Sequence, residues 1–207
     1  MQNLSKEEFF KQRSLAEKLC DARTILNRKR FLRNESVLEN VVESDLLRFK
    51  AIMDDLEESS LVSDWIIGGG TAVMYYSEVV PTIDIDVFAR YAAKSFLAPL
   101  SEVYAHLVEK YNARFEAEMV RIGSLYLQFL PADSGNPADA EAVRHPKIIQ
   151  DGLRLFELEY LICSMLHVGS RKYLSRLTLI KSESRYEEAK LIGLLKTFGL
   201  EQKWESL

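Results

Sequence analysis

The stretch from Trp65 to Phe88 constrains the fold of this chain more than any other part of the sequence. It opens with an apolar, β-prone run, continues through three glycines at positions 68–70, and ends in a β-branched run that carries two aspartates. Glycine has no Cβ, so the backbone at the triplet can approach another group closely. The pattern predicts a strand, a glycine turn, a short helix, a second turn and a second strand, in that order.

The two aspartates, Asp84 and Asp86, are spaced so that both belong to one face of the second predicted strand. Side chains alternate between the two faces of a strand, so residues two apart point the same way. Two close carboxylates repel each other, and a hard cation such as Mg²⁺ relieves that repulsion. The predicted strand therefore carries a candidate metal site, and the predicted helix offers its N-terminus to phosphate.

These two features together resemble the signature of the nucleotidyltransferase superfamily, whose members share the fold of polymerase β. Residues 69–72 read Gly-Gly-Thr-Ala, and residues 82–86 read Thr-Ile-Asp-Ile-Asp. Both match the motifs of the bacterial AbiEii/AbiGii-type toxin branch and related small nucleotidyltransferases. A glycine triplet alone is more often a turn, and an Asp-x-Asp pair alone is more often solvated strand surface. Their order and spacing carry the resemblance.

The resemblance runs from about Leu61 to the end of the chain. In the family, a buried helix is followed by Gly-x-Arg-Lys-Asp, an arginine, and a closing Leu-x-x-Lys-Trp. The matching residues here are Gly169, Arg171, Lys172, Arg176, Leu200, Lys203 and Trp204. The first sixty residues lie outside the resemblance.

The resemblance implies an α/β (α+β) fold: a mixed-sheet nucleotidyltransferase fold with an N-terminal helical segment and a C-terminal helical layer. It divides the chain into an N-terminal helical segment (1–60), a nucleotidyltransferase core (61–145) and a C-terminal helical part packed on the core (146–207).

The nucleotide site that the resemblance implies draws on both the core and the C-terminal helical part. The glycine turn would hold the β- and γ-phosphates of an NTP, the acid pair would hold Mg²⁺, and basic residues of the helical part would neutralise phosphate charge. The implied nucleotide-binding residues are Gly69, Gly70, Thr71, Arg171, Lys172 and Arg176, and the implied catalytic, metal-binding residues are Asp84 and Asp86.

The third carboxylate that the family usually carries, which would complete a two-metal site, is missing here. The corresponding predicted strand runs from Leu125 to Leu130, and Gln128 takes the position of the acid. An amide can ligate Mg²⁺ through its oxygen, but it brings no charge and cannot take a proton from an attacking hydroxyl. The carboxylates that could substitute for it are Glu116, Glu118 and Asp133.

Two functions remain open from the sequence. The first is an enzyme that uses Mg²⁺ to transfer a nucleoside monophosphate from an NTP to a protein or RNA acceptor, as the toxin or modifying half of a two-gene system. The second is a degenerate module of the same fold that binds nucleotide, RNA or a partner protein without chemistry. Gln128 separates them, because another carboxylate on the acid-pair face would favour the enzyme. Val80 and Tyr173 also depart from the family, which has arginine and aspartate there.

Composition limits the partners of the chain. Its 207 residues carry a formal net charge of -4, so bulk electrostatics do not favour nucleic acid and any such binding needs a local patch. The stretch from Lys18 to Arg33 is basic, and it could contact RNA or an acidic partner, although a solvated basic helix is the favoured interpretation. Two distant cysteines and the lack of a long apolar run predict a reduced, cytoplasmic protein without a membrane span.

Local patterns predict the remaining elements. Capping boxes at Ser5 and Ser36 predict helix starts, and the second predicted helix carries an apolar stripe from Val42 to Leu56. Other predictions are a helix ending at Tyr111, strands at Glu116–Arg121 and Leu125–Leu130 joined by a Gly123-Ser124 turn, a loop over 131–139, and helices over Leu155–Val168, Arg171–Ile180 and Arg185–Phe198.

Overall fold

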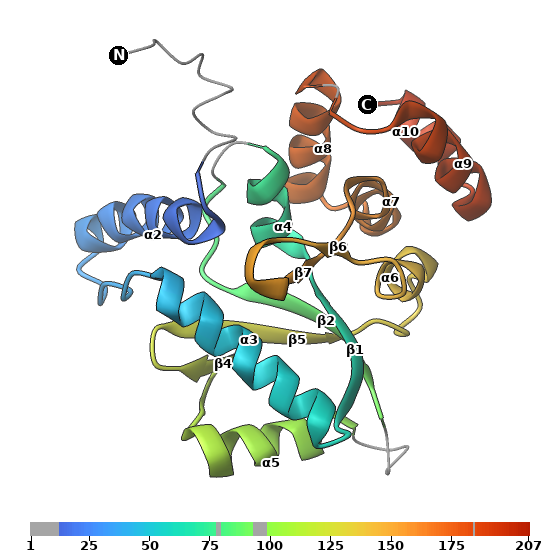
Figure 1. Ribbon diagram of the computed structural model, residues 1–207. Helices are drawn as coiled ribbons and strands as arrows, with labels where there is room; N and C mark the ends of the chain where they lie inside the picture. The colour runs from blue at the N-terminus through green and yellow to red at the C-terminus, as the bar shows by residue number, and fades with distance from the viewer. Residues whose placement is uncertain (1–12, 78–79, 93–98, 184) are drawn as a thin grey trace.

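Strand β1 (Val62–Ile67) lies near the middle of a seven-stranded mixed sheet in the computed structural model, which describes residues 13–77, 80–92, 99–183 and 185–207 (Figure 1). The strand order is β3-β4-β5-β2-β1-β7-β6. The other strands are β2 (Ile85–Tyr91), β3 (Arg114–Glu116), β4 (Met119–Ile122), β5 (Leu125–Pro131), β6 (Lys147–Ile148) and β7 (Arg154–Leu155). β2 is antiparallel to β1 and parallel to β5, so the predicted mixed α/β fold is confirmed.

Helices cover both faces of this sheet (Figure 1). They are α2 (Leu15–Leu32), α3 (Glu43–Glu58), α4 (Gly69–Tyr76), α5 (Pro99–Tyr111), α6 (Pro137–Ala142), α7 (Leu158–Val168), α8 (Arg171–Glu183), α9 (Glu188–Phe198) and α10 (Glu201–Glu205). Side chains of β1 alternate between two hydrophobic cores, one on each face of the sheet. Trp65 and Ile67 belong to the core with α2, α3 and α5, whereas Ile66 belongs to the core with α6, α7 and α9. No described helix is long and apolar enough to cross a membrane.

Two helix starts differ from the sequence patterns. The predicted Ser5 start lies outside the described residues, and α2 instead begins at a capping box formed by Ser14 and Glu17. The predicted start at Ser36 is wrong, because α3 begins at Glu43, where the Asp45 carboxylate accepts the Val42 N–H at 2.9 Å. The stripe is otherwise confirmed: Leu46, Phe49, Met53 and Leu56 are buried, while Val42 is exposed.

The segment after Ser36 is extended because α2 holds its backbone. Asn27 donates to the Leu38 carbonyl at 2.9 Å and accepts the Leu38 N–H at 2.7 Å. Arg30 donates to the Ser36 carbonyl at 2.5 Å. These side-chain bonds satisfy backbone groups that a helix beginning at Ser36 would have needed for itself.

The predicted Gly123-Ser124 hairpin turn is confirmed, with Gly123 at a φ of 63°. The predicted strand Glu116–Arg121 is interrupted by a turn at Ala117, whose φ is 56°, so it forms parts of β3 and β4. Two short strands, β6 and β7, were not predicted; each has only two residues, too few to show a period.

Three further segments differ in detail from their patterns. The predicted loop over 131–139 contains the start of α6, because the Asn136 side chain accepts the Ala138 N–H at 3.1 Å. Helix α7 begins at Leu158 rather than Leu155, since Leu155 pairs with β1 as part of β7. Its predicted end at Gly169 is confirmed by a left-handed φ of 64°.

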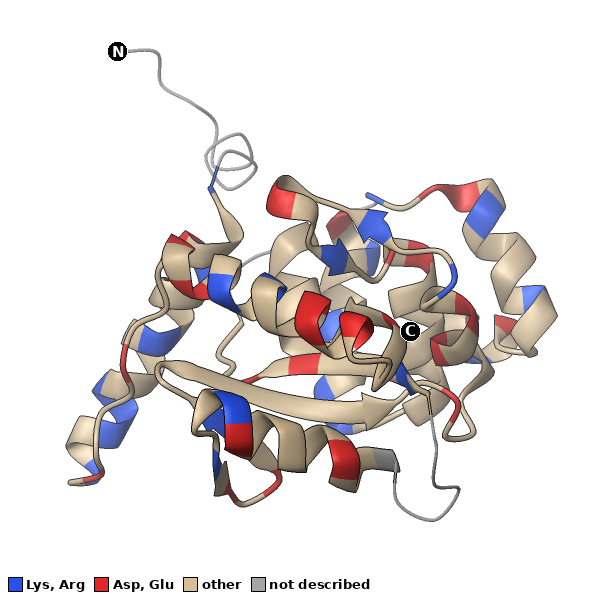
Figure 2. Ribbon diagram, turned by 60° about the horizontal axis from the view of Figure 1, so that its bottom comes forward, with Lys and Arg blue, Asp and Glu red and all other residues tan. Residues whose placement is uncertain are grey.

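The second half of helix α2 is basic (Figure 2), but the two cations of its first half do not form the solvated surface that the basic pattern favours. Lys18 and Arg23 are 4% and 1% exposed. Lys18 donates to the Met74 carbonyl at 2.9 Å, and Arg23 donates to the Ile83 carbonyl at 2.7 Å. Helix α2 therefore forms hydrogen bonds at both ends of the segment that connects α4 to β2.

Candidate functional site

The acid pair lies at the N-terminal end of helix α4. Asp84 directly precedes β2, and Asp86 is its second residue. An Asp86 oxygen, Oδ2, accepts the Gly70 N–H at 3.3 Å, and Asp84 Oδ1 accepts the Thr82 hydroxyl at 3.1 Å. Both carboxylates are thus held where the positive end of the helix dipole favours negative charge.

The glycine turn permits this approach. Gly69 has a φ of 52°, and a Cβ added there would lie 1.6 Å from Asp86 Oδ2. A Cβ added at Gly70 would lie 2.9 Å from the Thr82 hydroxyl oxygen and 3.2 Å from Arg176 Nη2. Because these glycines have no side chain, the Asp86 carboxylate and the Arg176 guanidinium can lie close to the start of the helix.

Thr71 lies inside the helix start rather than on its open side. Its side chain is fully buried, and its hydroxyl donates to the Asp84 carbonyl at 3.2 Å. This bond fixes the backbone of Asp84. The hydroxyl is therefore engaged with the acid-pair backbone and would have to leave that bond to contact phosphate.

Gln128 lies beside both carboxylates because the parallel register of β2 and β5 pairs it with Asp86. With its amide nitrogen turned toward the acids, it donates to Asp84 Oδ2 at 3.2 Å and to Asp86 Oδ1 at 3.3 Å. In the opposite orientation the nitrogen meets only Glu118 Oε2, at 3.4 Å, and the amide oxygen faces the acids. Carboxylates only accept hydrogen bonds, so the first orientation satisfies all three groups.

A third carboxylate does not join the pair. Glu116 and Asp133 form ion pairs with arginines of neighbouring strands, at 3.2 Å and 3.4 Å. Glu118 lies 3.4 Å from the Gln128 amide nitrogen when that nitrogen is turned away from the acids. Within the described part of the chain, no three acidic, His or Cys side chains lie close enough together to hold a metal ion.

Helix α8 supplies positive charge from the opposite side of the glycine turn. Arg176 is 7% exposed, and its Nη1 is buried with no hydrogen-bond partner among the described residues. Its guanidinium lies 5.8 Å from the centroid of the Tyr173 ring. Burial lowers the pKa of Arg176, against the opposing effect of Tyr173 and the two aspartates. A guanidinium remains charged in proteins, so a buried donor is left for an anion.

The neighbouring charges of the site act on the pKa of Asp86 in both directions. Burial, and then the charge of Asp84, raise the pKa of Asp86 to about 6, while the Gly70 N–H, Lys172 and Arg176 act in the opposite direction. Lys172 is exposed on α8 and acts on the pair through its charge. Arg171 is also exposed, and the described structure shows no contact between its side chain and the acid pair.

Two contributors were missed in the sequence. Tyr173 stacks beneath Arg176, and Arg23 holds the carbonyl that precedes Asp84. A signal for Arg23 was present, because it follows Leu15 and Leu19 at spacings of four and so continues their buried stripe.

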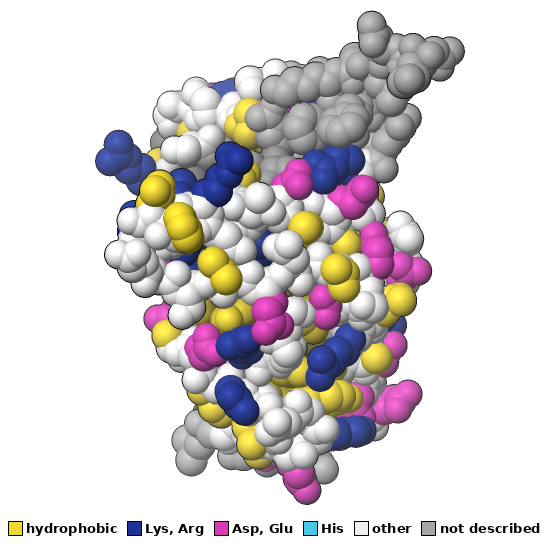
Figure 3. All heavy atoms as spheres, turned by 90° about the vertical axis from the view of Figure 1, so that its left-hand side faces the viewer, with side chains coloured by type: hydrophobic (Ala, Val, Ile, Leu, Met, Phe, Trp, Pro, Cys, Tyr) yellow, Lys and Arg dark blue, Asp and Glu magenta, His cyan; other side chains and the backbone are white. Residues whose placement is uncertain are grey.

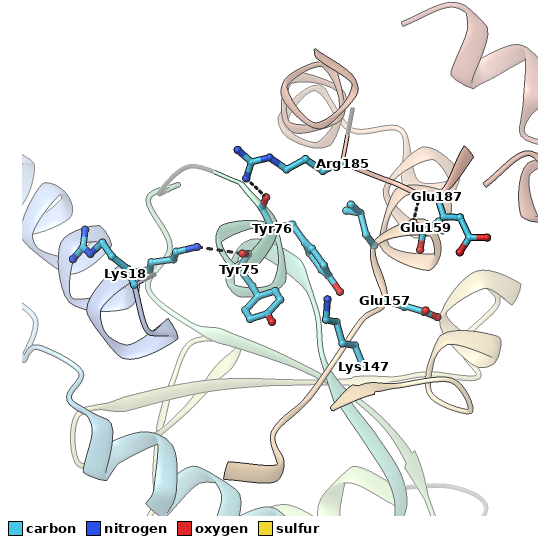
Figure 4. Close-up of a pocket in the computed structure, with 10 residues that line it drawn as sticks. Lys18, Tyr75, Tyr76, Lys147, Glu157, Glu159, Arg185 and Glu187 are labelled. Carbon is cyan, nitrogen blue, oxygen red and sulfur yellow. Dashed lines mark hydrogen bonds between the residues drawn. The ribbon is translucent and has the colours of Figure 1, made fainter. Parts of the chain in front are cut away.

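A cavity of about 710 Å³ lies at the other end of α4 (Figure 4). There Lys18 and Arg185 donate to backbone carbonyls of the last turn, Lys18 to Tyr75 at 3.2 Å and Arg185 to Tyr76 at 2.9 Å. The Lys147 ammonium lies 5.0 Å and 5.3 Å from the centroids of the two tyrosine rings. These cations already have protein partners, unlike Arg176 Nη1.

No protein-family model matches the chain, and no curated protein matches it. Its structure is similar to the crystal structure of ANT(2″)-Ia in complex with adenylyl-2″-tobramycin, with 17% identity, 75% of this chain and 97% of that chain covered, and a TM-score of 0.45. It is also similar to a solution structure of the antibiotic-resistance factor ANT(2″)-Ia, with 14% identity, 80% and 96% covered, and a TM-score of 0.43.

Proposed function

We propose that this chain is a Mg²⁺-dependent nucleotidyltransferase, which transfers a nucleoside monophosphate from an NTP to a protein or RNA hydroxyl. One observation carries the proposal: the glycine turn brings an acid pair and a buried arginine with an unpartnered donor to the same helix start. Such a site can take a cation and a polyanion side by side. A Mg²⁺–triphosphate has both parts.

The acid pair fits a single Mg²⁺. The ion is commonly bound through one or two carboxylates together with substrate phosphates, and Asp84 and Asp86 provide two. Burial, and then the charge of Asp84, raise the pKa of Asp86, so a bound cation would offset a cost of keeping both carboxylates charged in the folded chain. When bound, Mg²⁺ would stabilise the charge that develops around the α-phosphorus.

The remaining residues would bind and orient the triphosphate and neutralise its charge. Arg176 and Lys172 would contact the triphosphate and stabilise charge on the departing pyrophosphate. The acceptor oxygen forms a bond to the α-phosphorus, the α–β bridging P–O bond breaks, and pyrophosphate leaves with the bonding electrons. The hydroxyl proton passes to an aspartate of the pair or to water, since the amide of Gln128 cannot take it.

The alternative is a degenerate module of the same fold, which holds nucleotide, RNA or a partner protein without transfer. The amide of Gln128 favours it, because two N–H donors partly satisfy the carboxylates that a metal would otherwise neutralise. The absence of a third acid among the described residues favours it as well.

Incubation with each α-labelled NTP and Mg²⁺, with and without cell extract, separates the two functions. The enzyme should transfer label to a protein or RNA band, and Asp84→Asn should abolish the transfer while changing the melting temperature little. Asn can still accept from Thr82, so a large loss of stability would make the acid pair structural. Nucleotide binding without transfer would support the module. Neither binding nor transfer would contradict the enzyme and would leave the module only RNA or a partner protein as its ligand.

The toxin half of a two-gene system remains part of the proposal. Expression of the chain alone should then slow bacterial growth, Asp84→Asn should restore it, and the neighbouring gene should protect the cell. Equal growth of the wild type and the variant would contradict this role.

A further inference from the structure

Three large apolar side chains at the end of α2 and in the segment after it are exposed together. Phe31 is 74% exposed, Leu32 is 82% exposed and Val37 is 64% exposed. They line an open groove of about 530 Å³ with Thr24, Asn27, Arg28 and Asn40. Figure 3 shows hydrophobic and basic side chains exposed on the side of the molecule that carries α2. Exposed apolar groups that cluster and are bordered by polar residues mark interaction sites.

The groove is preformed. Asn27 binds both backbone groups of Leu38, which is buried, and Arg30 binds the Ser36 carbonyl. These bonds hold Val37 against the same face of α2 that carries Phe31. A partner would therefore meet an ordered surface and would not have to order this segment on binding.

Cations on and near the groove carry charge that the described chain does not neutralise: Arg28 lines the groove, and Lys29 and Arg33 directly follow the groove residues Arg28 and Leu32 in the sequence. Arg28, Lys29 and Arg33 form no ion pair among the described residues, whereas Arg30 lies 3.6 Å from Glu35. Cations at a helix C-terminus interact favourably with the helix dipole, which explains part of this charge. The dipole does not explain the three exposed apolar side chains beside it.

We propose that this surface, formed by Phe31, Leu32 and Val37 with Arg28, Lys29 and Arg33, binds an acidic amphipathic helix of a partner protein. The apolar face of the helix would enter the groove, and its Asp and Glu side chains would meet the three cations. An RNA partner fits less well, because nucleic-acid surfaces are mainly polar and basic and this groove has one aromatic ring. The net charge of -4 also opposes nucleic acid.

The test uses a fluorescein-labelled peptide of about 18 residues, with Leu at positions i, i+3, i+4 and i+7, Glu at about four of the other positions and Ala at the rest, so that it can form a helix. A matched peptide carries Lys in place of Glu. Fluorescence anisotropy with the full chain should show saturable binding of the Glu peptide, weaker at about 300 mM than at about 50 mM salt. The Lys peptide should bind at least about tenfold more weakly.

Two matched double variants locate the binding. Arg28→Glu with Leu32→Ser changes the surface at a spacing of four residues, and Ile192→Ser with Lys196→Glu makes the same change on the exposed face of α9. The first should weaken binding by about tenfold or more, and the second by less than about twofold. Far-UV circular dichroism and melting should match the wild type for both.

Three results would overturn the proposal. Equal binding of the two peptides, or an equal loss in the α9 variant, would show nonspecific adhesion. Tighter binding of an RNA of about 20 nucleotides, lost in the Arg28→Glu/Leu32→Ser variant, would make the surface a nucleic-acid site. Self-association in sedimentation velocity that this variant abolishes would assign the surface to a second copy of the chain.

Discussion

The two ends of helix α4 both gather charged side chains, but they use them differently. At the C-terminal end, Lys18 and Arg185 donate to carbonyls of the last turn, so those cations satisfy the backbone. At the N-terminal end, Asp84 and Asp86 crowd each other and Arg176 Nη1 has no partner among the described residues. The first arrangement stabilises the fold. The second is electrostatically unfavourable in the folded chain. A ligand that brings a cation to the aspartates and an anion to Arg176 would remove that unfavourable free energy.

The largest loss of stability should come from closing the space at the N-terminal end. Gly69→Ala places a Cβ 1.6 Å from Asp86 Oδ2 at a φ of 52°, so the carboxylate must move and the backbone is strained. We expect a loss of about 3 kcal/mol in urea unfolding. Gly199→Ala is the control, because its φ is 65° and no atom lies within 4 Å of the added Cβ. Its loss should be near 1 kcal/mol. Equal losses would mean that the contact with Asp86 is not a constraint.

Removal of a cation at the C-terminal end should cost less. Lys18→Met leaves the Met74 and Tyr75 carbonyls without the ammonium that they share, in a buried position. The expected loss is about 2 kcal/mol, with nucleotide binding unchanged in affinity. The exposed Lys29→Met, on the same helix, should cost less than about 0.5 kcal/mol. A Lys18→Met variant as stable as the wild type would show that these bonds contribute nothing.

Neutralising Asp86 should instead increase stability, and only above a defined pH. Its folded pKa of about 6 exceeds the ordinary value of 3.8, so the folded chain holds the proton more tightly and wild-type stability falls as pH rises from about 4 to 6. Asp86→Asn removes this fall. Its gain should be near zero at pH 4 and reach about 3 kcal/mol above pH 6.

The buried Asp139 provides the control for this titration, because burial raises its pKa to about 6 as well. Both the wild type and Asp86→Asn retain Asp139, so their difference isolates Asp86. A gain that is the same at pH 4 and pH 7 would contradict the raised pKa of Asp86.

The smallest effect should come from Gln128→Glu. A third carboxylate would add charge for Mg²⁺, so we expect its affinity to rise by about fivefold, with lower thermal stability when no metal is present. Any transfer activity should also rise. Loss of an activity that the wild type clearly has would show that the amide belongs to a working site.

Local patterns predicted most of the strands and helices. They did not predict hydrogen bonds between residues far apart in the sequence. The face of β5 that carries Gln128 follows from alternation, a local property, whereas its pairing with Asp86 depends on the long-range register of β2 and β5. The burial of Lys18 and Arg23 depends on carbonyls about sixty residues away, and only the stripe shared with Leu19 signals it. The predicted helix start at Ser36 is wrong because the Asn27 side chain forms hydrogen bonds with both backbone groups of Leu38.

The central claim is that the N-terminal end of α4 is poised for a Mg²⁺–triphosphate. Calorimetric titration of non-hydrolysable NTP analogues into the wild type, with and without Mg²⁺, tests it directly. We expect saturable 1:1 binding of at least one analogue that requires Mg²⁺, is lost in Arg176→Met, and is retained in Arg185→Met at the opposite end of the helix. No binding of any analogue to the wild type, or unchanged binding to Arg176→Met, would contradict the claim.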